Sequence, residues 1–458
     1  MLEQGKILPR QRQQVGIIGA SHIFTGPVAR DLCFEPRLAG SEVALFDLNE
    51  ERALNTAKVC QRLADEVGAD IRFKSVPSRT AVIQDTDILI NTALHGGREL
   101  GDRVKRAVAE RTGIYGPIEA HAPYGQLRLM LDIAQDLEKI APHATLIQCA
   151  NPIPEGGTLI TKETGVRFIG VCHGYKEWEH LARVLGMNPE LAHVSIAGIN
   201  HDVWLIEFLY QNQDAYPRLD EWIRETADHW LRTFLPHAKN VDYQLSRAAF
   251  DLYRRFGVMP IGDTTRASTP ELSRYGYHDS PEDEERFFGK EQGFESPIGE
   301  AKSREWRTTS LADIDRIAKE PGSVQPIFPR GPSGWQIVPI MVSLATNQPS
   351  IQEVNIRNGG SIKGLSDDMV VEVPAIVNAQ GAHTEGTIEI PPAILERVLL
   401  PRAEQAKAHI DAFITGDVRP LREQLLRNHK LQGNPATADA IIDVWRSFDP
   451  DMAAHFSR

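Results

Sequence analysis

The stretch that decides the fold is Gln14-Val15-Gly16-Ile17-Ile18-Gly19-Ala20, a β-branched apolar run that ends in glycine. Such a run predicts a buried strand followed by a tight turn. Residues 28–32 then predict the start of a helix, and residues 43–47 predict a second strand that ends in the acid Asp47. This order of elements is typical of a nucleotide-binding sheet.

The same alternation continues along the first half of the chain. Apolar residues in the segment 50–67 recur at helical spacing, and residues 124–140 predict an amphipathic helix. Further buried strands are predicted at residues 86–92, 144–149 and 166–172. We therefore expect an α/β fold, with a Rossmann-like, doubly wound and mostly parallel sheet in the N-terminal half.

The pattern changes after residue 200. Helices are predicted at residues 220–235, 243–256, 338–344, 403–415 and 438–448, and strands at residues 351–356 and 370–375. Residues 280–307 are acidic and weakly periodic, which predicts a mobile loop. We expect two domains: residues 1–200 for NAD binding, and residues 201–458, of mixed α+β structure, for catalysis, substrate binding and oligomerisation.

Composition narrows the class of protein. The chain has 458 residues, a net charge of −12 and four irregularly spaced cysteines. The negative charge argues against binding to nucleic acids or membrane surfaces, because both need basic patches. No apolar run approaches the roughly 20 residues of a membrane span, and residues 1–14 lack the apolar core of a signal peptide. The sequence predicts a cytoplasmic protein.

The glycines after the first strand predict a dinucleotide site, although the full G-x-G-x-x-G fingerprint is absent. A helix N-terminus would receive the pyrophosphate, and Asp47 would accept hydrogen bonds from ribose hydroxyls. An acid there disfavours the extra phosphate of NADP, so we expect NAD. The alternative is that Gly16 and Gly19 only make a tight turn in an unliganded domain. The candidate cofactor-binding residues are Gly19, Ser21, His22, Asp47, Asn91 and Asn151.

Two segments predict a metal site: Gly170-Val171-Cys172-His173-Gly174 and Gly198-Ile199-Asn200-His201. Each places its cysteine or histidine after an apolar run, where open α/β sheets bind ligands. Thiolate and imidazole suit zinc, manganese or iron. Alternatively, Cys172 packs as a small hydrophobic residue and His201 is structural. His173 is a candidate proton donor because histidine titrates near neutrality.

Several motifs together resemble a known family. They are Asn151-Pro152-Ile153, the two segments around Cys172 and His201, the run at residues 247–253, Gly262-Asp263, and residues 355–362 followed by residues 370–374. In order and spacing they resemble the family 4 glycoside hydrolases and the related NAD-dependent sulfoquinovosidases, from about residue 13 to residue 448.

The resemblance implies hydrolysis through a temporary oxidation. NAD takes a hydride from C3 of the sugar, and a metal, usually manganese in this family, polarises the ketone so that the C2 proton becomes acidic. The aglycone leaves by elimination, water adds, and the hydride returns, so NAD is a resident cofactor. By this resemblance Cys172 and His201 are metal ligands, and His173 helps to protonate the leaving group.

The base that removes the C2 proton stays open. Asp263 aligns with an acidic position of the family. Tyr243, Tyr275 and Tyr277 are alternatives that could equally be packing residues.

Two departures from the family pattern bear on the substrate. Ser21-His22 stands where many members have a third glycine, and residues 119–125 replace an Asp-Thr-x-Gly-Pro-Gly-Gly segment while keeping an acid, Glu119. The changed loop favours the sulfoquinovosidase-like relatives at least as much as the α-galactosidases or α-glucuronidases.

The residue after the cysteine also bears on the sugar. Members that act on 6-phospho-sugars tend to have Asn or Asp there, whereas Cys-His-Gly resembles the branch that handles acidic sugars. A carboxylate or sulfonate calls for an arginine fork, which Arg266 could supply. The cluster Lys302, Arg304 and Arg307 is an alternative that could equally be a solvated face. We expect an acidic hexoside, a sulfoquinovoside before a glucuronide, with substrate contacts from Glu119, Asn151, Asn200 and Arg266.

Two other classes of protein fit parts of the pattern. An ordinary NAD-dependent sugar dehydrogenase or epimerase would share the sheet, but a dehydrogenase would release NADH in proportion to substrate. A dinucleotide sensor would not need the pair Cys172 and His201. The resemblance favours the glycosidase, with NAD and Mn²⁺ as cofactors and a homo-oligomer as the assembly.

Overall fold

The computed structural model describes residues 12–20, 22–116, 118, 124–234, 245–266, 269–289, 297–328 and 330–456. The strands of its first half are β1 (Gln14–Ile18), β2 (Ser41–Phe46), β3 (Ile71–Ser75), β4 (Ile88–Asn91), β5 (Thr145–Gln148) and β6 (Arg167–Gly170). They pair in parallel in the order β3-β2-β1-β4-β5-β6. This is the strand order of a Rossmann sheet, which confirms the predicted fold of the first half.

The helices of the first half connect these strands. They are α1 (His22–Cys33), α2 (Glu50–Val67), α3 (Arg79–Ile83), α4 (Gly97–Thr112), α5 (Tyr124–Ile140) and α6 (Ile153–Glu163). α2 shows why the local sequence is helical: Asn49 caps its first turn by accepting the N–H of Arg52, and Gly68, with φ 69°, ends it in the left-handed conformation.

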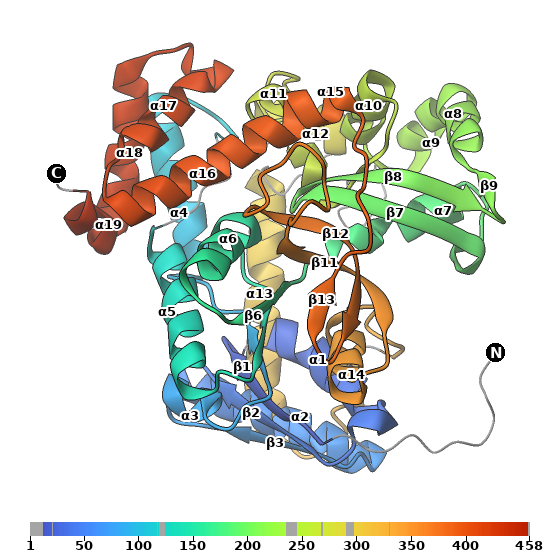
Figure 1. Ribbon diagram of the computed structural model, residues 1–458, viewed down its shortest axis with the longest axis vertical. Helices are drawn as coiled ribbons and strands as arrows, with labels where there is room; N and C mark the ends of the chain where they lie inside the picture. Colours follow the sequence, from blue (N-terminus) through green and yellow to red (C-terminus); the bar gives the residue numbers. More distant parts are fainter. Residues whose placement is uncertain are drawn as a thin grey trace.

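The second half extends the same sheet with antiparallel strands. These are β7 (Ala192–Ile199), β8 (Asp202–Tyr210), β9 (Gln213–Asp214), β10 (Pro260–Ile261), β11 (Ser350–Arg357), β12 (Val370–Asn378) and β13 (Gly381–His383). The whole order is β10-β8-β7-β12-β11-β6-β5-β4-β1-β2-β3, with β13 beside β12 and β9 beside β8 (Figure 1). The predicted domain boundary at residue 200 falls in the turn between β7 and β8, and the division into two domains stays a prediction.

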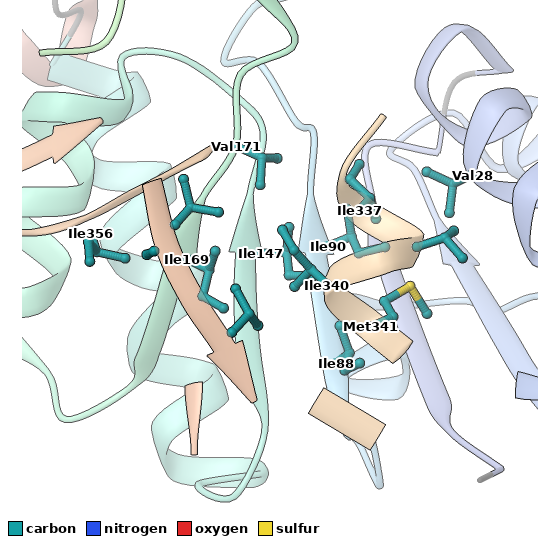
Figure 2. Close-up of a cluster of buried hydrophobic side chains, with 14 of the residues drawn as sticks. Val28, Ile88, Ile90, Ile147, Ile169, Val171, Ile337, Ile340, Met341 and Ile356 are labelled. Carbon is teal, nitrogen blue, oxygen red and sulfur yellow. The ribbon is translucent and has the colours of Figure 1, made fainter. Parts of the chain in front are cut away.

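Helices of the second half surround this extension. They are α7 (Trp178–Val184), α8 (Tyr216–Glu225), α9 (Ala227–Phe234), α10 (Arg247–Phe256), α11 (Pro270–Ser273), α12 (Pro281–Phe288), α13 (Pro297–Ile317), α14 (Ile337–Thr346), α15 (Pro392–Ile394), α16 (Leu400–Thr415), α17 (Arg419–Arg427), α18 (Pro435–Phe448) and α19 (Pro450–His455). α14 packs against the parallel strands, where Ile337, Ile340 and Met341 meet Ile88 and Ile90 (Figure 2). None of the helices in the described ranges is long and apolar enough to cross a membrane.

The prediction of a mobile loop at residues 280–307 was wrong for residues 280–289 and 297–307, whereas residues 290–296 lie outside the described residues. Ser280 caps α12 by accepting the N–H of Asp283 at 3.1 Å, and three acids in the first turn suit the helix dipole. α13 follows as a helix of 21 residues that lies along α1 and α2 (Figure 1).

The antiparallel hairpin β11–β12 joins the two halves at one point. Asn355 of β11 is paired with Gly170 at the end of β6, and Glu372 of β12 is paired with Gly198 near the end of β7. Because β6 leads to Cys172 and β7 leads to His201, this pairing brings the two predicted metal ligands to the same part of the sheet.

Candidate active site

The turn after β1 is shaped to receive a dinucleotide. Gly19 has φ 80°, and its N–H donates to Phe46 O at 2.9 Å. A Cβ at Gly19 would lie 2.7 Å from the backbone nitrogen of Ala93, so only glycine fits between the two loops. The cradle lies where α1 begins, which is the position that binds pyrophosphate in Rossmann sheets.

The other predicted cofactor residues differ in their surroundings. Asp47 directly follows β2 and is half-buried. One of its carboxylate oxygens accepts the N–H of Asn49 at 2.9 Å. Asn91 is fully buried, and its side chain donates to Gln148 Oε1 and accepts the N–H of Ala93. Asn91 therefore fixes the loop after β4, and its contact with the cofactor stays a prediction. Ser21 and the side chain of His22 lie outside the described residues.

Cys172 follows β6 and is half-buried among polar groups. Its carbonyl accepts a hydrogen bond from Gln336 Nε2 at 2.9 Å, and its sulfur packs against Gly174. Burial raises the pKa of the thiol, and the carboxyl groups of Glu372 and Asp263 raise it further. A cation at this position would oppose both effects and favour the thiolate.

His201 stands in the tight turn between β7 and β8. Its φ of 68° is unusual for a residue with a side chain, so the turn holds it in a strained conformation. Its Nε2 lies 3.5 Å from Asn151 Nδ2, and its Nδ1 lies 3.6 Å from Asp263 Oδ2. Arg266 Nη1 lies 3.5 Å from the same Asp263 oxygen. Four of the predicted site residues are therefore neighbours in space.

Asn200 lines the cavity described below and also makes contacts within the protein, and its contact with the substrate stays a prediction. Its Nδ2 donates to Glu372 Oε2 at 2.7 Å, and Asn355 Nδ2 lies 3.3 Å from the same oxygen. The amide also bonds to the Cys172 thiol. Burial raises the pKa of Glu372 to about 7, so this carboxyl is held in place at an energetic cost. Asn200 thus holds Glu372 in place next to Cys172.

Arg402 and Glu155 form a buried ion pair that also lies close to the residue after His201. Arg402 of α16 lies with Nη1 2.7 Å from Glu155 Oε1 on α6. Its Nε lies 3.5 Å from Asp202 Oδ2, in the residue after His201. This contact connects the C-terminal helices to the site.

A cavity of about 630 Å³ opens beside these residues, a volume suited to a sugar and part of a cofactor. Asn151, His201, Asp263 and Arg266 line one part of it. Further lining residues that were not predicted from the sequence come from α4, α13 and α18: Arg98, Asp102, Ser303 and Trp445. A signal for Arg98 existed, because Gly96-Gly97-Arg98 follows a buried strand and opens a helix.

His173, Tyr275 and Tyr277 are not among the described residues that line this cavity. The ring of His173 packs against Trp335 with centroids 5.5 Å apart, and burial and the charge of Lys176 lower its pKa to about 4. His173 is therefore neutral near pH 7, and its role as proton donor stays a prediction.

Tyr275 and Tyr277, two of the predicted alternatives for the C2 base, are held by contacts away from the cavity. Tyr277 is 1% exposed and donates to Asp251 at 2.7 Å, while Tyr275 donates to Glu271 at 2.8 Å. Burial raises the pKa of both hydroxyls, that of Tyr275 to about 12. Of the predicted bases, Asp263 is the one that reaches the cavity; Tyr243, like the predicted substrate contact Glu119, lies outside the described residues.

Several donor atoms near Cys172 are of the kinds that bind a metal ion. Within the described ranges, no group of three or more His, Cys, Asp and Glu side chains is placed to hold one. An amide supplies a further donor, because Asn200 Oδ1 is buried and has no hydrogen-bond partner in the described part of the chain. A sulfur, an imidazole nitrogen and an unbonded amide oxygen fit a divalent transition metal.

The fold and the site together define a Rossmann-fold enzyme that converts a small polar molecule at the carboxyl edge of its sheet. The chain belongs to the family 4 glycosyl hydrolases: the family model matches residues 14–187, and the model of the family's C-terminal domain matches residues 196–431. The predicted resemblance is confirmed, and the chain is a glycoside hydrolase.

Relatives span nearly the same length. The chain is 23% identical to an α-galactosidase of Rhizobium meliloti over 96% of this chain and 88% of the relative. It is 23% identical to an α-galacturonidase of Thermoanaerobacter italicus over 87% of each protein. Its fold is similar to that of the 6-phospho-β-glucosidase of Thermotoga maritima solved with manganese, NAD⁺ and glucose-6-phosphate, with a TM-score of 0.72 and 14% identity over 96% of this chain and 98% of that one.

Proposed function

We propose that this protein hydrolyses the glycosidic bond of an acidic hexoside, a sulfoquinovoside or an α-glucuronide, with NAD and Mn²⁺ as resident cofactors. The observation that carries the proposal is that Asp263 lies 3.6 Å from His201, interacts electrostatically with Cys172, and lines a cavity whose wall also holds five cationic side chains. A family relative that is an α-galacturonidase, and a structural neighbour bound to NAD⁺ and manganese, support the acidic sugar and the cofactors respectively.

The residues present fit both cofactors. Gly19 and the start of α1 would hold the NAD pyrophosphate, and Asp47 the ribose. Cys172, His201 and Asn200 Oδ1 would hold the ion. When bound, NAD accepts and returns a hydride, and the metal stabilises negative charge on a sugar oxygen.

Asp263 is the residue that moves the C2 proton in this proposal. The cavity wall carries three other acids, and each has a structural partner: Asp102 pairs with Arg307, Glu300 with Lys105, and Asp449 caps α19. Asp263 Oδ2 lies 3.6 Å from His201 Nδ1 and 3.5 Å from Arg266 Nη1, and among the described residues no other acid of the wall lies beside His201 in this way. An ionised carboxylate beside the sugar carbon is the base that the reaction needs.

The test is a panel of 4-nitrophenyl α-sulfoquinovoside, α-glucuronide and α-galactoside with NAD and MnCl₂. We expect release of nitrophenol from an acidic glycoside, no net NADH, and exchange of deuterium from C2 of the substrate into water. The variant D263N should abolish this exchange while NAD binding is unchanged. Retention of the C2 label during turnover would refute the elimination route, and NADH formed in proportion to substrate would indicate a dehydrogenase.

A further inference from the structure

The cavity wall contains one cation that the protein does not balance. Five cationic side chains line the cavity, and four of them have a carboxylate partner: Lys105 with Glu300 at 2.9 Å, Arg307 with Asp102 at 3.4 Å, Arg266 with Asp263 at 3.5 Å, and Arg402 with Glu155 at 2.7 Å. The fifth, Arg98, has no hydrogen bond or ion pair with any residue in the described part of the chain.

The backbone places Arg98 at the cavity by a sharp turn. Gly96 and Gly97, with φ of 66° and 69°, end the loop after β4, and Arg98 is the second residue of α4. Its side chain is exposed to solvent and lines the cavity. The cavity wall removes part of the water around the Arg98 guanidinium. This desolvation and the charges of Arg307 and Arg266 lower the pKa of Arg98, which stays cationic at neutral pH. An anion bound here would relieve the repulsion between the guanidinium groups.

A second guanidinium is fixed beside it. Arg307, on α13, bonds to Ser303 Oγ at 2.8 Å and to Asp102 at 3.4 Å, so its orientation is set by the protein. Arg98 also lies within electrostatic range of Asp263, the proposed base. The unbalanced cation and the base therefore face the same cavity.

We propose that Arg98, flanked by Arg307, binds the acidic group at C6 of the hexoside, and that Arg266 instead positions Asp263. This inference rests on the proposed function, since it names the residue that recognises its substrate class. A planar guanidinium can hold a carboxylate or a sulfonate through two parallel hydrogen bonds. Arg266 is less suited to this role because its guanidinium already contacts Asp263.

The test compares R98Q and R98K with R111Q. Arg111 is exposed in the last turn of the same helix, about 20 Å along its axis, so R111Q makes the same change of charge away from the cavity. The substrates are 4-nitrophenyl α-sulfoquinovoside and α-glucuronide, with the neutral 4-nitrophenyl α-glucoside for comparison. Binding of free glucuronate, of methyl α-glucoside and of NAD is measured by calorimetry for each variant.

We expect R98Q to lose roughly 10- to 100-fold in kcat/KM on the acidic glycoside and a similar factor in glucuronate affinity, the effect of one charged hydrogen-bonding group. R98K should lie between R98Q and wild type. R111Q, NAD affinity and the neutral sugar should change less than about threefold.

Three results would overturn the inference. R98Q could match R111Q on the acidic substrate, it could lose the neutral sugar equally, or it could lose NAD affinity, which would assign Arg98 to a cofactor phosphate. Failure of the wild-type protein to cleave any acidic glycoside would instead refute the proposed substrate class.

Discussion

The buried ion pair behind His201 allows a quantitative test of how the site is supported. Arg402 and its partners Glu155 and Asp202 have side chains that are at most 3% exposed. The variant R402M keeps much of the volume and removes the charge, which leaves two carboxyl groups buried without a cation. Breaking a buried pair from one side costs roughly 3–5 kcal/mol of unfolding free energy, and we expect R402M to fall in this range.

Variants of the partner and of an exposed pair give the comparison. E155Q should cost about 1–3 kcal/mol, because the amide still accepts a hydrogen bond from Arg402. The double variant R402M/E155Q should cost less than the sum of the two, since it buries one carboxyl group fewer. R422M removes an exposed cation that lies 2.6 Å from Asp439 and should leave the free energy of unfolding almost unchanged.

The pH dependence of R402M has a defined sign. Burial opposes ionisation of Glu155, but the charge and hydrogen bond of Arg402 outweigh it, so its pKa is lowered in the native protein. A lowered carboxyl pKa contributes stability above the unfolded pKa, and this is lost as the pH falls. Without Arg402 the pKa of Glu155 should rise, so the cost of R402M should be smaller at pH 5 than at pH 7.

Urea unfolding followed by tryptophan fluorescence measures these differences. The reasoning is refuted if R402M and R422M agree within about 1 kcal/mol, which would make the buried pair equivalent to a surface pair. Exact additivity in the double variant would also contradict it.

Three further predictions concern the cofactors and the leaving group. G19A should weaken NAD binding more than tenfold in calorimetry, because the new Cβ would lie 2.7 Å from Ala93 and its left-handed backbone costs roughly 1–2 kcal/mol; an unchanged Kd would refute the cradle. C172S should weaken Mn²⁺ binding more than tenfold, as measured by electron paramagnetic resonance, since a hydroxyl is a poorer ligand than a thiolate, and equal affinity would exclude Cys172 as a ligand. H173Q should slow a methyl glycoside more than a nitrophenyl glycoside, because nitrophenolate leaves without a proton; equal losses would argue against proton donation.

The sequence alone predicts the strands of the first half, because a short local pattern determines each of them. The buried strands of the first half are short apolar runs, and their carboxyl ends in a parallel sheet must share an edge. Cys172 and Asn151 could therefore be placed at one edge from pattern alone. His201 was also predicted from the apolar run before it, but its strand is antiparallel to its neighbours, so its position beside Asp263 did not follow from the rule for parallel strands.

Two features could not be predicted from the sequence. The amides of Asn91 and Asn200, at strand ends, bond to Gln148 and Glu372, which are distant in sequence and could not be assigned as partners beforehand. α13 lacked a clear apolar period because polar contacts help to hold it against α2, among them Asn55 to Asp315 at 2.8 Å. Periodicity detects an apolar stripe and misses such contacts.

The hairpin β11–β12 explains why the site needs both halves of the chain. A parallel sheet alone would supply the cofactor turn and Cys172, whereas His201 comes from an antiparallel hairpin. Glu372 connects the two, because one of its oxygens lies within hydrogen-bonding distance of the amides of Asn200 and Asn355. Its backbone is paired with Gly198, where a Cβ would lie 2.2 Å from Asp202 O. A buried carboxyl group with a raised pKa opposes folding, so its presence at this junction is best explained by the register that it imposes between Cys172 and His201.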